Sequence, residues 1–556
     1  MAIADINDTK YEMEGELFRH QERAIEWMAD VEDNPRHGMV GGILCLTQGL
    51  GKTLTAITHV VCTWLATPMD ERRPALILVK KAVLPEWKRC IEQFYPGLVA
   101  DTVFLHADYM RRRDIDAFTQ EIALSKMFVI TTYDTLMYRG WERDIDCCLE
   151  YGAENSRFRG KVMGVSTRTL DQTRRRDVQG RRVLYYTPWR FAFADESQVF
   201  ANPGTKTYRA VMGVYGQSKW CLTGTPIRNE CTDLYAQLRW CGMSDVIAST
   251  PLLWKRRVHE GVFDRYRLDR FILNMDYTKA GVKLPEKKRH VIAVELESDE
   301  EKAIYENMRQ RTLEALHSAS ISNHVTYAHV LALFTRLRQT CVAAHVITPQ
   351  SKRDNRPALV HFQPDSSVAE WCLDREGTAG IMSTKLQKMV EVIKRVPADE
   401  KVVIFSNFVA LMDLAEEAVM VETDTECFMI DGGISGTERD TQLAEFKAHP
   451  GKAVLFVNYK VGAEGLNITE ANHVICLEPW WNYATHSQAE ARCWRIGQTR
   501  NVHVYDIFIK DSIESRILEI CSVKREQAEA FFGRQNVGDG DKTRMSLATI
   551  YQLLGP

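Results

Sequence analysis

The segment GLGKT (residues 49–53) connects an apolar run (40–46) to a stretch of helical composition. Glycines allow a loop backbone to approach a phosphate closely, so that its N–H groups and the N-terminus of the following helix can bind the anion. The amino group of Lys52 would then reach the β- and γ-phosphates of a nucleotide, and the hydroxyl of Thr53 would ligate magnesium. Because Leu46 occupies the first glycine position of the strict phosphate-binding motif, a structural turn stays open as the alternative at this point.

Two adjacent carboxylates, Asp195 and Glu196, end the apolar run 190–196. A carboxylate at the end of a buried strand can hold magnesium, directly or through water, while its neighbour orients or deprotonates an attacking water. An isolated Asp-Glu pair is more often a solvated turn. Its place at the end of an apolar run, downstream of GLGKT, favours phosphoryl chemistry.

Gln488, Arg492 and Arg495 are separated by four and three residues, which predicts that they share one face of a helix. Two arginines suit a transition state in which negative charge spreads over the γ-phosphate oxygens, and such arginines contribute about 10³–10⁵ in rate. A solvated basic helix face is the alternative. If phosphate-binding residues lie in one lobe and the arginines in another, hydrolysis can be coupled to lobe closure.

Two sets of short apolar strands must position these residues. Continuous apolar strands, each followed by a polar loop and an amphipathic stretch, are typical of parallel sheets covered by helices on both faces. The predicted strands are 40–46, 75–80, 127–132, 190–196 and 219–224 in the first half, and 401–407, 427–432, 453–458, 473–478 and 502–509 in the second. The intervening residues show helical periodicity. The sequence therefore predicts an α/β fold of two lobes with a helical region between them.

The composition fits a globular protein of several compact units. The chain has 556 residues, of which 45% are hydrophobic and 26% charged, which excludes a fibrous or largely disordered protein. A net charge of −3 argues against a uniformly basic coat protein but allows a local basic patch. The acidic N-terminus lacks the features of a secretory signal, and no apolar run is long enough to cross a bilayer. The 14 cysteines include no C-x-x-C pair, so we expect reduced, mostly buried thiols in a soluble intracellular protein, without disulfides or a zinc site.

From about Leu17 to its C-terminus, the chain resembles the Snf-type (Swi/Snf, sucrose non-fermenting) ATPases of helicase superfamily two. The blocks of that family occur in order: LFRHQERAIEWM (Q motif), GLGKT (I), ALILVKKAVLPEW (Ia), FVITTYDTL (Ib), DESQ (II), LTGTPIRN (III), VIFSNF (IV), GAEGLNIT (V) and QAEARCWRIGQ (VI). The strings PWWN (479–482) and RIGQ (495–498) are characteristic of this family as against unwinding helicases in general.

The resemblance implies two RecA-like lobes, a C-terminal brace, the use of ATP with Mg²⁺, and a role for each matching residue. The residues expected to bind ATP are Gln21, which would read adenine, Gly49, Leu50, Gly51, Lys52, Thr53 and Gln488. Thr53 and Asp195 would hold the metal ion. The catalytic residues would be Lys52, Glu196, which activates water, Arg492 and Arg495. Gln198, Thr223 and Thr225 would couple the ATP site to the DNA site.

The same resemblance implies DNA contacts that are directed at phosphate and independent of base sequence. The residues expected to make them are Lys80, Thr132, Tyr133, Asn407, Gly432, Asn467 and Trp481. Helix capping or turn formation is the alternative for the threonines and asparagines, and core packing is the alternative for Trp481.

The sequence departs from the family pattern at several positions. Leu46-Thr47-Gln48 stand where Asp-Glu-Met is usual, and Gln198 stands where motif II more often has histidine. Asn274-Met275 replace a usual Arg-Arg pair, and Trp494 replaces a usual histidine. None of these changes removes a group that hydrolysis requires, and glutamine can still donate and accept hydrogen bonds.

A basic segment (155–190) lies between motifs Ib and II and carries ten basic residues against two acidic ones. We hypothesise that it is a flexible arm that binds phosphate, with a solvated loop as the alternative. If it is such an arm, neutralising Arg174, Arg175 and Arg176 would flatten the salt dependence of DNA binding.

We divide the chain into four parts: 1–245, a first RecA-like lobe; 246–380, a helical linker and protrusion region; 381–510, a second RecA-like lobe; and 511–556, a C-terminal brace and tail. The sequence predicts a DNA-dependent ATPase that translocates on double-stranded DNA and remodels or displaces bound protein without strand separation. The alternatives are a strand-separating DNA or RNA helicase and a DNA-binding scaffold with an impaired ATPase.

The expected partners are double-stranded DNA and a DNA-bound protein or complex, with no membrane. A nucleosome, as in chromatin remodelling, a polymerase, a repair filament or a viral transcription complex would fit. The setting would be the nucleus in a eukaryote, and otherwise the cytoplasm or a virus.

Overall fold

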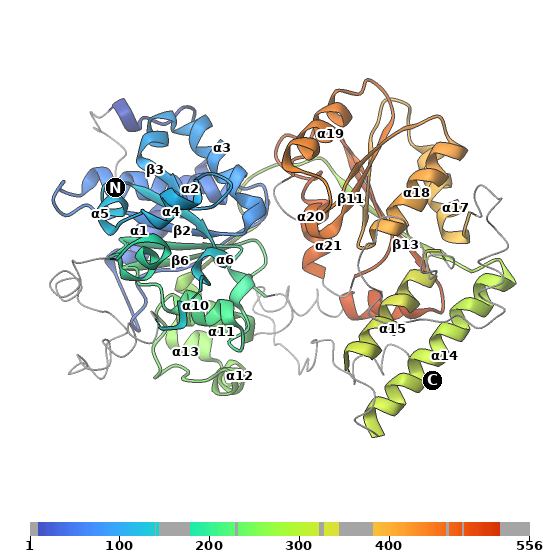
Figure 1. The fold of residues 1–556 in the computed structure, drawn as a ribbon, viewed down its shortest axis with the longest axis horizontal. Helices are drawn as coiled ribbons and strands as arrows, with labels where there is room; N and C mark the ends of the chain where they lie inside the picture. The colour runs from blue at the N-terminus through green and yellow to red at the C-terminus, as the bar shows by residue number, and fades with distance from the viewer. Residues whose placement is uncertain are drawn as a thin grey trace. The chain divides into compact units, whose positions relative to one another are not determined.

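The computed structural model describes residues 9–139, 141–143, 178–227, 232–321, 327–343, 382–462, 466–480 and 483–522. The chain divides into two compact units, Met1–Lys283 and Leu284–Pro556 (Figure 1). Among the described helices, none has an apolar stretch long enough to span a bilayer.

Unit 1 is built on a seven-stranded sheet in which every pairing is parallel, in the order β3-β4-β2-β5-β6-β1-β7. Its strands are β1 (Gly42–Leu46), β2 (Ala75–Val79), β3 (Thr102–Phe104), β4 (Phe128–Thr132), β5 (Phe191–Asp195), β6 (Ser218–Thr223) and β7 (Ile272–Met275). Strands β1, β2, β4 and β5 are buried along their whole length, as expected for a parallel sheet covered on both faces.

Helices precede and connect these strands. They are α1 (Arg19–Asp33), α2 (Lys52–Ala66), α3 (Leu84–Phe94), α4 (Arg112–Asp116), α5 (Gln120–Leu124), α6 (Tyr133–Leu136), α9 (Val183–Tyr186), α10 (Lys206–Met212), α11 (Thr232–Trp240), α12 (Pro251–His259) and α13 (Val262–Tyr266).

Unit 2 has a six-stranded sheet, also wholly parallel, in the order β10-β11-β9-β12-β13-β8. Its strands are β8 (Lys287–Val294), β9 (Val402–Ser406), β10 (Glu426–Ile430), β11 (Ala453–Asn458), β12 (His473–Cys476) and β13 (Val502–Ile509). Its helices are α14 (Asp299–Ile321), α15 (Tyr327–Thr340), α17 (Thr384–Arg395), α18 (Val409–Glu422), α19 (Gly436–Ala448), α20 (Tyr459–Gly462) and α21 (Tyr483–Glu490).

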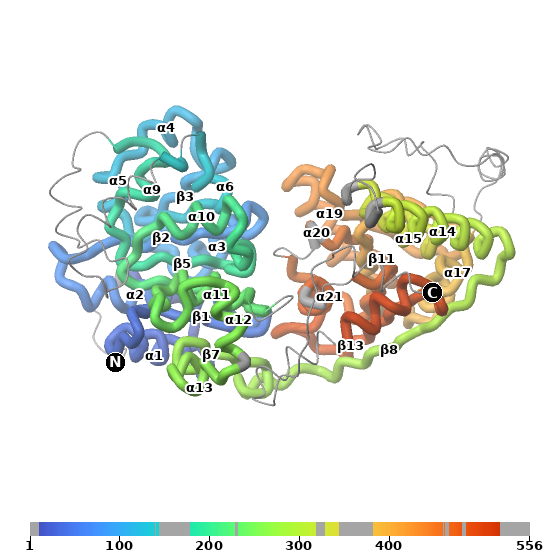
Figure 2. Tube along the Cα trace, turned by 90° about the horizontal axis from the view of Figure 1, so that it is seen from below, coloured from blue at the N-terminus to red at the C-terminus, as the bar shows by residue number. Residues whose placement is uncertain are grey.

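Each face of the second sheet has its own apolar core. Val402 and Ile404 of β9 pack with α14, α15, α17 and α18, whereas Val403 and Phe405 pack on the other face with α19 and α21. This division follows from the alternation of side chains along a strand. Figures 1 and 2 both show α14 and α15 side by side, on the face that α17 and α18 also cover.

All ten strands predicted from the sequence are present, with ends within two residues or fewer, and the α/β class with two parallel sheets is confirmed. Three further strands, β3, β7 and β8, were not predicted. The boundary at Lys283 falls inside the region 246–380, so that α12, α13 and β7 belong to unit 1, and β8, α14 and α15 to unit 2. The ten described cysteines are all free, as expected, and seven of them are buried.

The end of the basic segment differs from both expectations, the flexible arm that binds phosphate and the solvated loop. Residues 155–177 lie outside the described residues, but the end of the segment is packed into unit 1. Tyr185 and Trp189 are buried, and Trp189 Nε1 donates a hydrogen bond of 3.0 Å to the carbonyl of Leu184. Arg190 lies 3.5 Å from the buried carboxylate of Glu32. This end of the segment packs into unit 1 because residues 183–189 (VLYYTPW) are largely apolar, which a count of charges does not reveal.

A buried ion pair joins the C-terminal helical residues 513–522 to the rest of unit 2. Lys385 Nζ of α17 lies 2.6 and 2.8 Å from the two carboxylate oxygens of Glu514, and neither side chain is exposed. The N–H of Ile509 donates a further bond of 2.9 Å to Glu514. Leu386, Ile509 and Ile513, which adjoin the pair in sequence, belong to the apolar core of this face, so the pair forms away from water.

We expect Lys385→Met to lower the free energy of unfolding by about 3–5 kcal/mol, because it leaves a buried carboxylate without its counter-charge. Urea unfolding of the full chain would measure this, and the double variant Lys385→Met/Glu514→Met should recover most of the loss. Lys388→Met is the matched control, because its 2.8 Å pair with Glu391 lies on the surface. An equal effect of the two single variants would contradict the expectation.

Candidate nucleotide-binding and hydrolysis site

The predicted catalytic residues of unit 1 follow strands that are neighbours in the sheet. Strand β6 pairs with β5 on one side and with β1 on the other, and the register aligns Asp195 with Leu222 and Cys45 with Thr223. The carboxyl ends of parallel strands lie at one edge, so the turn after β1 and the ends of β5 and β6 converge there. Residues that are about 150 positions apart in sequence thus share one edge of the sheet.

The loop after β1 has the geometry of an anion-binding turn. Gly49 and Gly51 have φ angles of +84° and +75°, a left-handed conformation that favours glycine. Helix α2 then begins at Lys52 without any side-chain cap, so its first N–H groups remain available to a phosphate. Lys52 Nζ donates a 2.9 Å bond to the carbonyl of Leu46, which holds the amino group over the same loop.

Two side chains of α1 contact backbone carbonyls of this loop. Gln21 Nε2 donates a 3.3 Å bond to the carbonyl of Gly51, and His20 Nε2 lies 2.9 Å from the carbonyl of Leu50. A Cβ atom at Gly51 would lie only 2.3 Å from Gln21 Nε2, so a larger residue there would displace the Gln21 side chain from its bond to the loop. Gln21 was named from the sequence, whereas the contact of His20 was not. The position of His20 beside Gln21 in the Q motif was the signal that could have indicated it.

Asp195 is buried at the end of β5 and is surrounded by donors. Trp87 Nε1 donates 2.9 Å to its Oδ2, and the N–H of Glu196 donates 2.9 Å to its Oδ1. Burial and the neighbouring charge of Glu196 raise the pKa of the Asp195 carboxyl to about 7, against the opposing effects of Trp87 and Lys52. Glu196 itself has a φ of +50°, a strained conformation for a non-glycine residue that is typical of functional sites.

A hydrogen-bonded path leads from Glu196 to motif III. Gln198 Nε2 donates to the carboxylate of Glu196, and Thr223 Oγ1 donates 2.8 Å to Gln198 Oε1. The N–H of Thr225 in turn donates 3.0 Å to Thr223 Oγ1. The structure therefore brings together the three residues predicted to couple the sites, and both polar ends of Gln198 are in use.

A second bridge between motifs II and III was not predicted. Ser197 Oγ donates 2.7 Å to Gln237 Oε1, and Gln237 Nε2 donates 2.7 Å to the carbonyl of Pro226. Gln237 is fully buried in α11. A buried glutamine on a helix far along the chain carries no local motif, so sequence reasoning had no signal for it.

The residues present fit a bound Mg²⁺–nucleotide. Among the described residues, the structure gives the Thr53 hydroxyl no hydrogen-bond partner. The buried Asp195 carboxylate offers hard oxygen ligands, which magnesium prefers. Thr53 and Asp195 would hold the ion, and Lys52 and the N-terminus of α2 would bind the phosphates.

In unit 2 the structure corrects the expectation that Gln488, Arg492 and Arg495 share one helical face. Helix α21 ends at Glu490, and the N–H groups of Arg492 and Cys493 each bond to the carbonyl three residues earlier, at 3.1 and 3.0 Å. The α-helix therefore gives way to a tighter turn before it reaches the two arginines. Arg492 is buried, with Nη1 3.5 Å from the carbonyl of Leu466 in motif V, and Arg495 is half-buried.

Three of the seven residues expected to contact DNA have side chains that bond within their own unit. Thr132 caps α6 by accepting from the N–H of Thr135 at 3.2 Å, and the Tyr133 hydroxyl donates 2.6 Å to the carbonyl of Asp195. Asn407 Nδ2 donates 3.1 Å to the buried carboxylate of Glu478. Their contacts with DNA stay predictions, and a matching motif position does not show which way a side chain points.

The other four differ in their exposure. Gly432 and Asn467 are exposed, and Lys80 is half-buried at the end of β2. Trp481 lies outside the described residues. The contacts of these residues with DNA also stay predictions.

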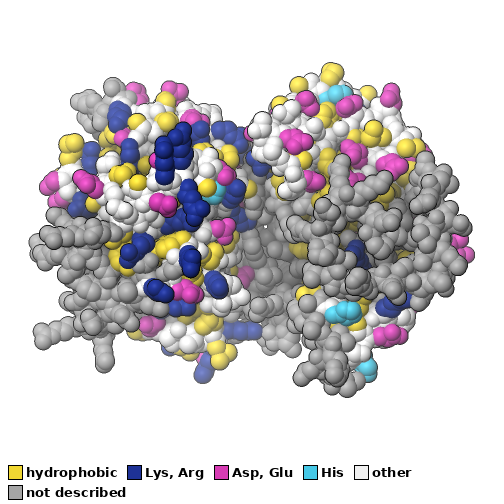
Figure 3. All heavy atoms as spheres, viewed as in Figure 1, with side chains coloured by type: hydrophobic (Ala, Val, Ile, Leu, Met, Phe, Trp, Pro, Cys, Tyr) yellow, Lys and Arg dark blue, Asp and Glu magenta, His cyan; other side chains and the backbone are white. Residues whose placement is uncertain are grey.

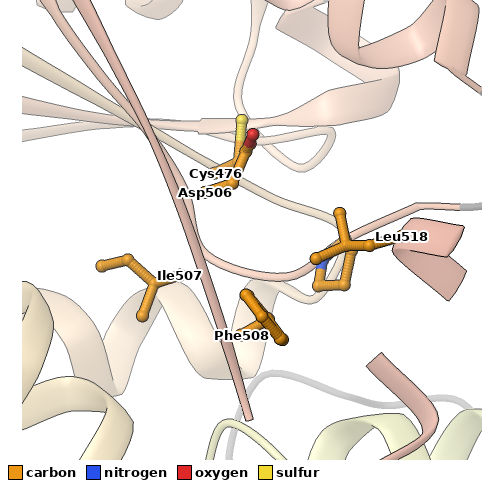
Figure 4. Close-up of a pocket in the computed structure, with 6 residues that line it drawn as sticks. Cys476, Asp506, Ile507, Phe508 and Leu518 are labelled. Carbon is orange, nitrogen blue, oxygen red and sulfur yellow. The ribbon is translucent and has the colours of Figure 1, made fainter. Parts of the chain in front are cut away.

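A second group of metal-ligating residue types lies in unit 2. Potential ligand atoms of Cys476, His486 and Asp506 lie within 4.8 Å of one another, and Figure 4 shows Cys476 beside Asp506. However, His486 Nε2 already accepts a 2.9 Å bond from the N–H of Trp480, which leaves the other ring nitrogen protonated in the neutral imidazole. Asp506 also accepts from Arg289. These contacts describe a hydrogen-bonded cluster, and we assign no metal ion to it.

Comparison with known proteins identifies two families along the chain. Residues 20–346 match the SNF2-related domain, and residues 384–497 match the helicase conserved C-terminal domain. The chain is 35% identical to the putative helicase 172L of Invertebrate iridescent virus 6 over 594 aligned residues, which cover 97% of this chain and 95% of the viral protein.

Longer proteins are also similar. The chain is 24% identical to the DNA repair protein RAD5 of Yarrowia lipolytica and 25% identical to the putative ATP-dependent helicase/translocase YwqA of Bacillus subtilis. The matches cover 93% and 90% of this chain but only 58% and 47% of those two proteins. A solved structure, the Sulfolobus solfataricus SWI2/SNF2 ATPase core in complex with dsDNA, is 22% identical, covers 94% of both chains and has a TM-score of 0.38.

We expect Asp195→Asn to raise the melting temperature at pH 8 in the presence of a chelator by several degrees. The folded pKa of about 7 lies above the ordinary value of 3.8, so ionisation of this carboxyl destabilises the native state. The advantage of the variant should therefore grow as the pH rises from about 4 to 7 and vanish below pH 4. Differential scanning calorimetry across this range would measure it, with the exposed Asp70→Asn as control. A lower melting temperature for Asp195→Asn at pH 8 would contradict the assignment.

Proposed function

This chain belongs to the SNF2-related family of ATP-dependent helicases and is an ATP hydrolase, and we propose that it is driven by double-stranded DNA, translocates along it and remodels or displaces bound protein without separating the strands. The observation that carries the proposal is the continuous path Glu196–Gln198–Thr223, which connects the hydrolytic carboxylate of motif II to motif III. A motor requires such a connection, because ATP hydrolysis at one site must change the conformation of another part of the protein.

In the proposed reaction, Lys52 and the N-terminal N–H groups of α2 bind the β- and γ-phosphates of ATP. Thr53 and Asp195 would hold the magnesium ion, which would supply positive charge to the phosphate oxygens. Glu196 orients the attacking water and accepts its proton. Arg492 and Arg495 of motif VI stabilise the transferring phosphoryl group, with Gln488 beside them in sequence.

Basic side chains on unit 1 support binding to a polyanion. Arg111, Arg112 and Arg113 are consecutive and exposed at the start of α4, and the exposed Lys81 follows β2. Figure 3 shows Lys and Arg side chains gathered on one face of this unit. Contacts of this kind are directed at the phosphate backbone and do not depend on base sequence. The similarity to RAD5, a DNA repair protein, agrees with DNA as the polymer.

The object that is moved would be a protein or complex bound to DNA. A nucleosome, a polymerase, a repair filament or a viral transcription complex each fits, and the 35% identity to a putative viral helicase favours a viral setting over a nucleus.

We expect duplex DNA to stimulate ATP hydrolysis by at least tenfold over the DNA-free rate, whereas single-stranded DNA and RNA should stimulate it much less. Steady-state ATP turnover with each polymer would measure this, with Lys52→Ala as the blank. Stimulation mainly by single strands or RNA would replace the proposal by a strand-separating helicase. Turnover no higher than that of the blank would favour a DNA-binding scaffold.

We expect Gln198→Ala to lower the DNA-stimulated kcat about tenfold, which corresponds to roughly 1.4 kcal/mol, with less than a twofold change in the KM for ATP. The variant interrupts the path from Glu196 to Thr223 but removes no group that binds phosphate. Gln198→His should keep most of the activity, because imidazole can also donate and accept. The exposed Gln93→Ala is the control, and a change confined to KM would contradict a coupling role.

A further inference from the structure

The segment that crosses the boundary between the two units is anchored at both ends. Strand β7 ends at Met275, strand β8 begins at Lys287, and the boundary itself lies between Lys283 and Leu284. Figure 2 allows the chain to be followed from β7 to β8. Each anchor lies within its own unit, and each involves a motif that the proposed reaction uses.

The first anchor is the phosphate-binding loop of unit 1. Strand β7 pairs with β1 up to Met275, whose carbonyl accepts a 3.0 Å bond from the N–H of Thr47. The hydroxyl of the buried Tyr277 then donates to the carbonyl of Gln48. A Cβ atom at Gly224 in motif III would lie 3.4 Å from Gln48 Cγ, so Gln48 lies next to motif III. The position of the loop is thus set by residues more than 220 positions downstream.

A compact turn follows this anchor directly. The N–H groups of Lys279 and Ala280 bond to the side chain and the carbonyl of Asp276 at 2.8 and 2.9 Å. The N–H of Val282 closes the turn on the carbonyl of Tyr277 at 2.9 Å. The path from Tyr277 to Val282 is therefore fixed by backbone bonds and has little freedom to extend.

The second anchor is the motif VI segment of unit 2. Trp494 Nε1 donates a 2.9 Å bond to the carbonyl of Pro285, and Lys287 Nζ lies 4.5 Å above the ring of Trp494. Lys287 also lies 2.9 Å from Glu490, the last residue of α21, to which Arg289 donates as well. Although burial acts in the opposite direction, Lys287 and Arg289 lower the pKa of Glu490 and keep this carboxylate charged.

Only Lys283 and Leu284 separate the closed turn at Val282 from the held carbonyl of Pro285. An extended chain spans about 3.5 Å per residue, so the two ends of this stretch can lie at most about 10 Å apart. Any larger change in the separation of the anchors must therefore act on the phosphate-binding loop or on the motif VI segment.

Most departures from the family pattern fall at these anchors. Thr47 and Gln48 lie at the first anchor with Asn274-Met275, and Trp494 forms the second. The unusual residues thus bond to the crossing segment at both of its ends. We expect this distribution if the departing residues bond to the crossing segment in a way of their own, because residues that bond to one segment must change together.

We propose that residues 275–287 form a strap that couples the phosphate-binding loop to the motif VI segment, with Tyr277 and Trp494 as positioning residues at its two ends. The inference rests on the proposed roles of Lys52, Arg492 and Arg495 in hydrolysis. Neither positioning residue needs to touch the nucleotide. Each transmits the state of its own motif into the strap, and through it to the other unit.

Hydrogen–deuterium exchange of the full chain tests the strap without requiring turnover. Trp494→Phe keeps an aromatic ring but removes the bond to Pro285, and it should increase exchange at residues 46–51 at least threefold although that loop is in the other unit. Tyr277→Phe should do the same at residues 486–495. Trp64→Phe is the matched control, because Trp64 Nε1 has no hydrogen-bond partner among the described residues. Changes confined to the unit that carries each substitution would overturn the proposal.

A double-mutant cycle on ATP turnover separates coupling from local damage. Each single variant should lower kcat about fivefold, and the double variant should be no slower than the slower single one, while their effects on melting temperature add. Losses in kcat that multiply would overturn the strap. Wild-type turnover equal to that of Lys52→Ala would instead refute the proposed ATPase cycle, and the exchange result would still decide the strap.

Discussion

The parallel pairing of β1 between β6 and β7, with β5 beyond β6, is the constraint on which unit 1 depends. Because these strands run in one direction, their carboxyl ends bring the turn after β1, the Asp195–Glu196 pair and Thr223 to one edge of the sheet. Strand β7 also ends at this edge, at Met275, whose carbonyl accepts a hydrogen bond from the N–H of Thr47. A shift of register in any one pairing would separate groups that the proposed reaction requires at the same phosphate.

The negative charge of Asp195 and Glu196 is a second constraint at this edge of the sheet. Asp195 is buried, and its donors, the Trp87 indole and the Glu196 N–H, supply hydrogen bonds but no positive charge. Lys52 is the nearby cation, and its amino group bonds to the carbonyl of Leu46. The protein alone therefore leaves the two carboxylates incompletely neutralised. A divalent cation that arrives with the nucleotide would remove this cost, which links the stability of unit 1 to the occupancy of its site.

The sequence was sufficient to predict the ten strands with continuous apolar character. It also placed the GLGKT loop and the Asp195–Glu196 pair at the ends of their strands. It was insufficient where the signal is weak or distant. Strand β3 has three residues, and β8 carries Lys287, Lys288 and Arg289 because it is an edge strand that is partly exposed, so neither shows the apolar run of a central strand. Spacing placed Arg492 and Arg495 on a helix but could not show that α21 ends at Glu490. The bond from Trp87 to Asp195 joins residues 108 positions apart, which no local pattern can indicate.

The pairing of β8 with β13 has a consequence for the order in which the chain can fold during synthesis. The sheet of unit 1 is complete once β7 has left the ribosome, so this unit can fold while the remainder is still being translated. In unit 2 the first strand, β8, must wait for β13, more than 200 residues later, before it acquires its neighbour. Lys385 likewise stays without its counter-charge until Glu514 emerges. The nascent second unit therefore exposes an unpaired edge strand and an unneutralised lysine for most of its translation, the interval in which chaperones would have most to bind.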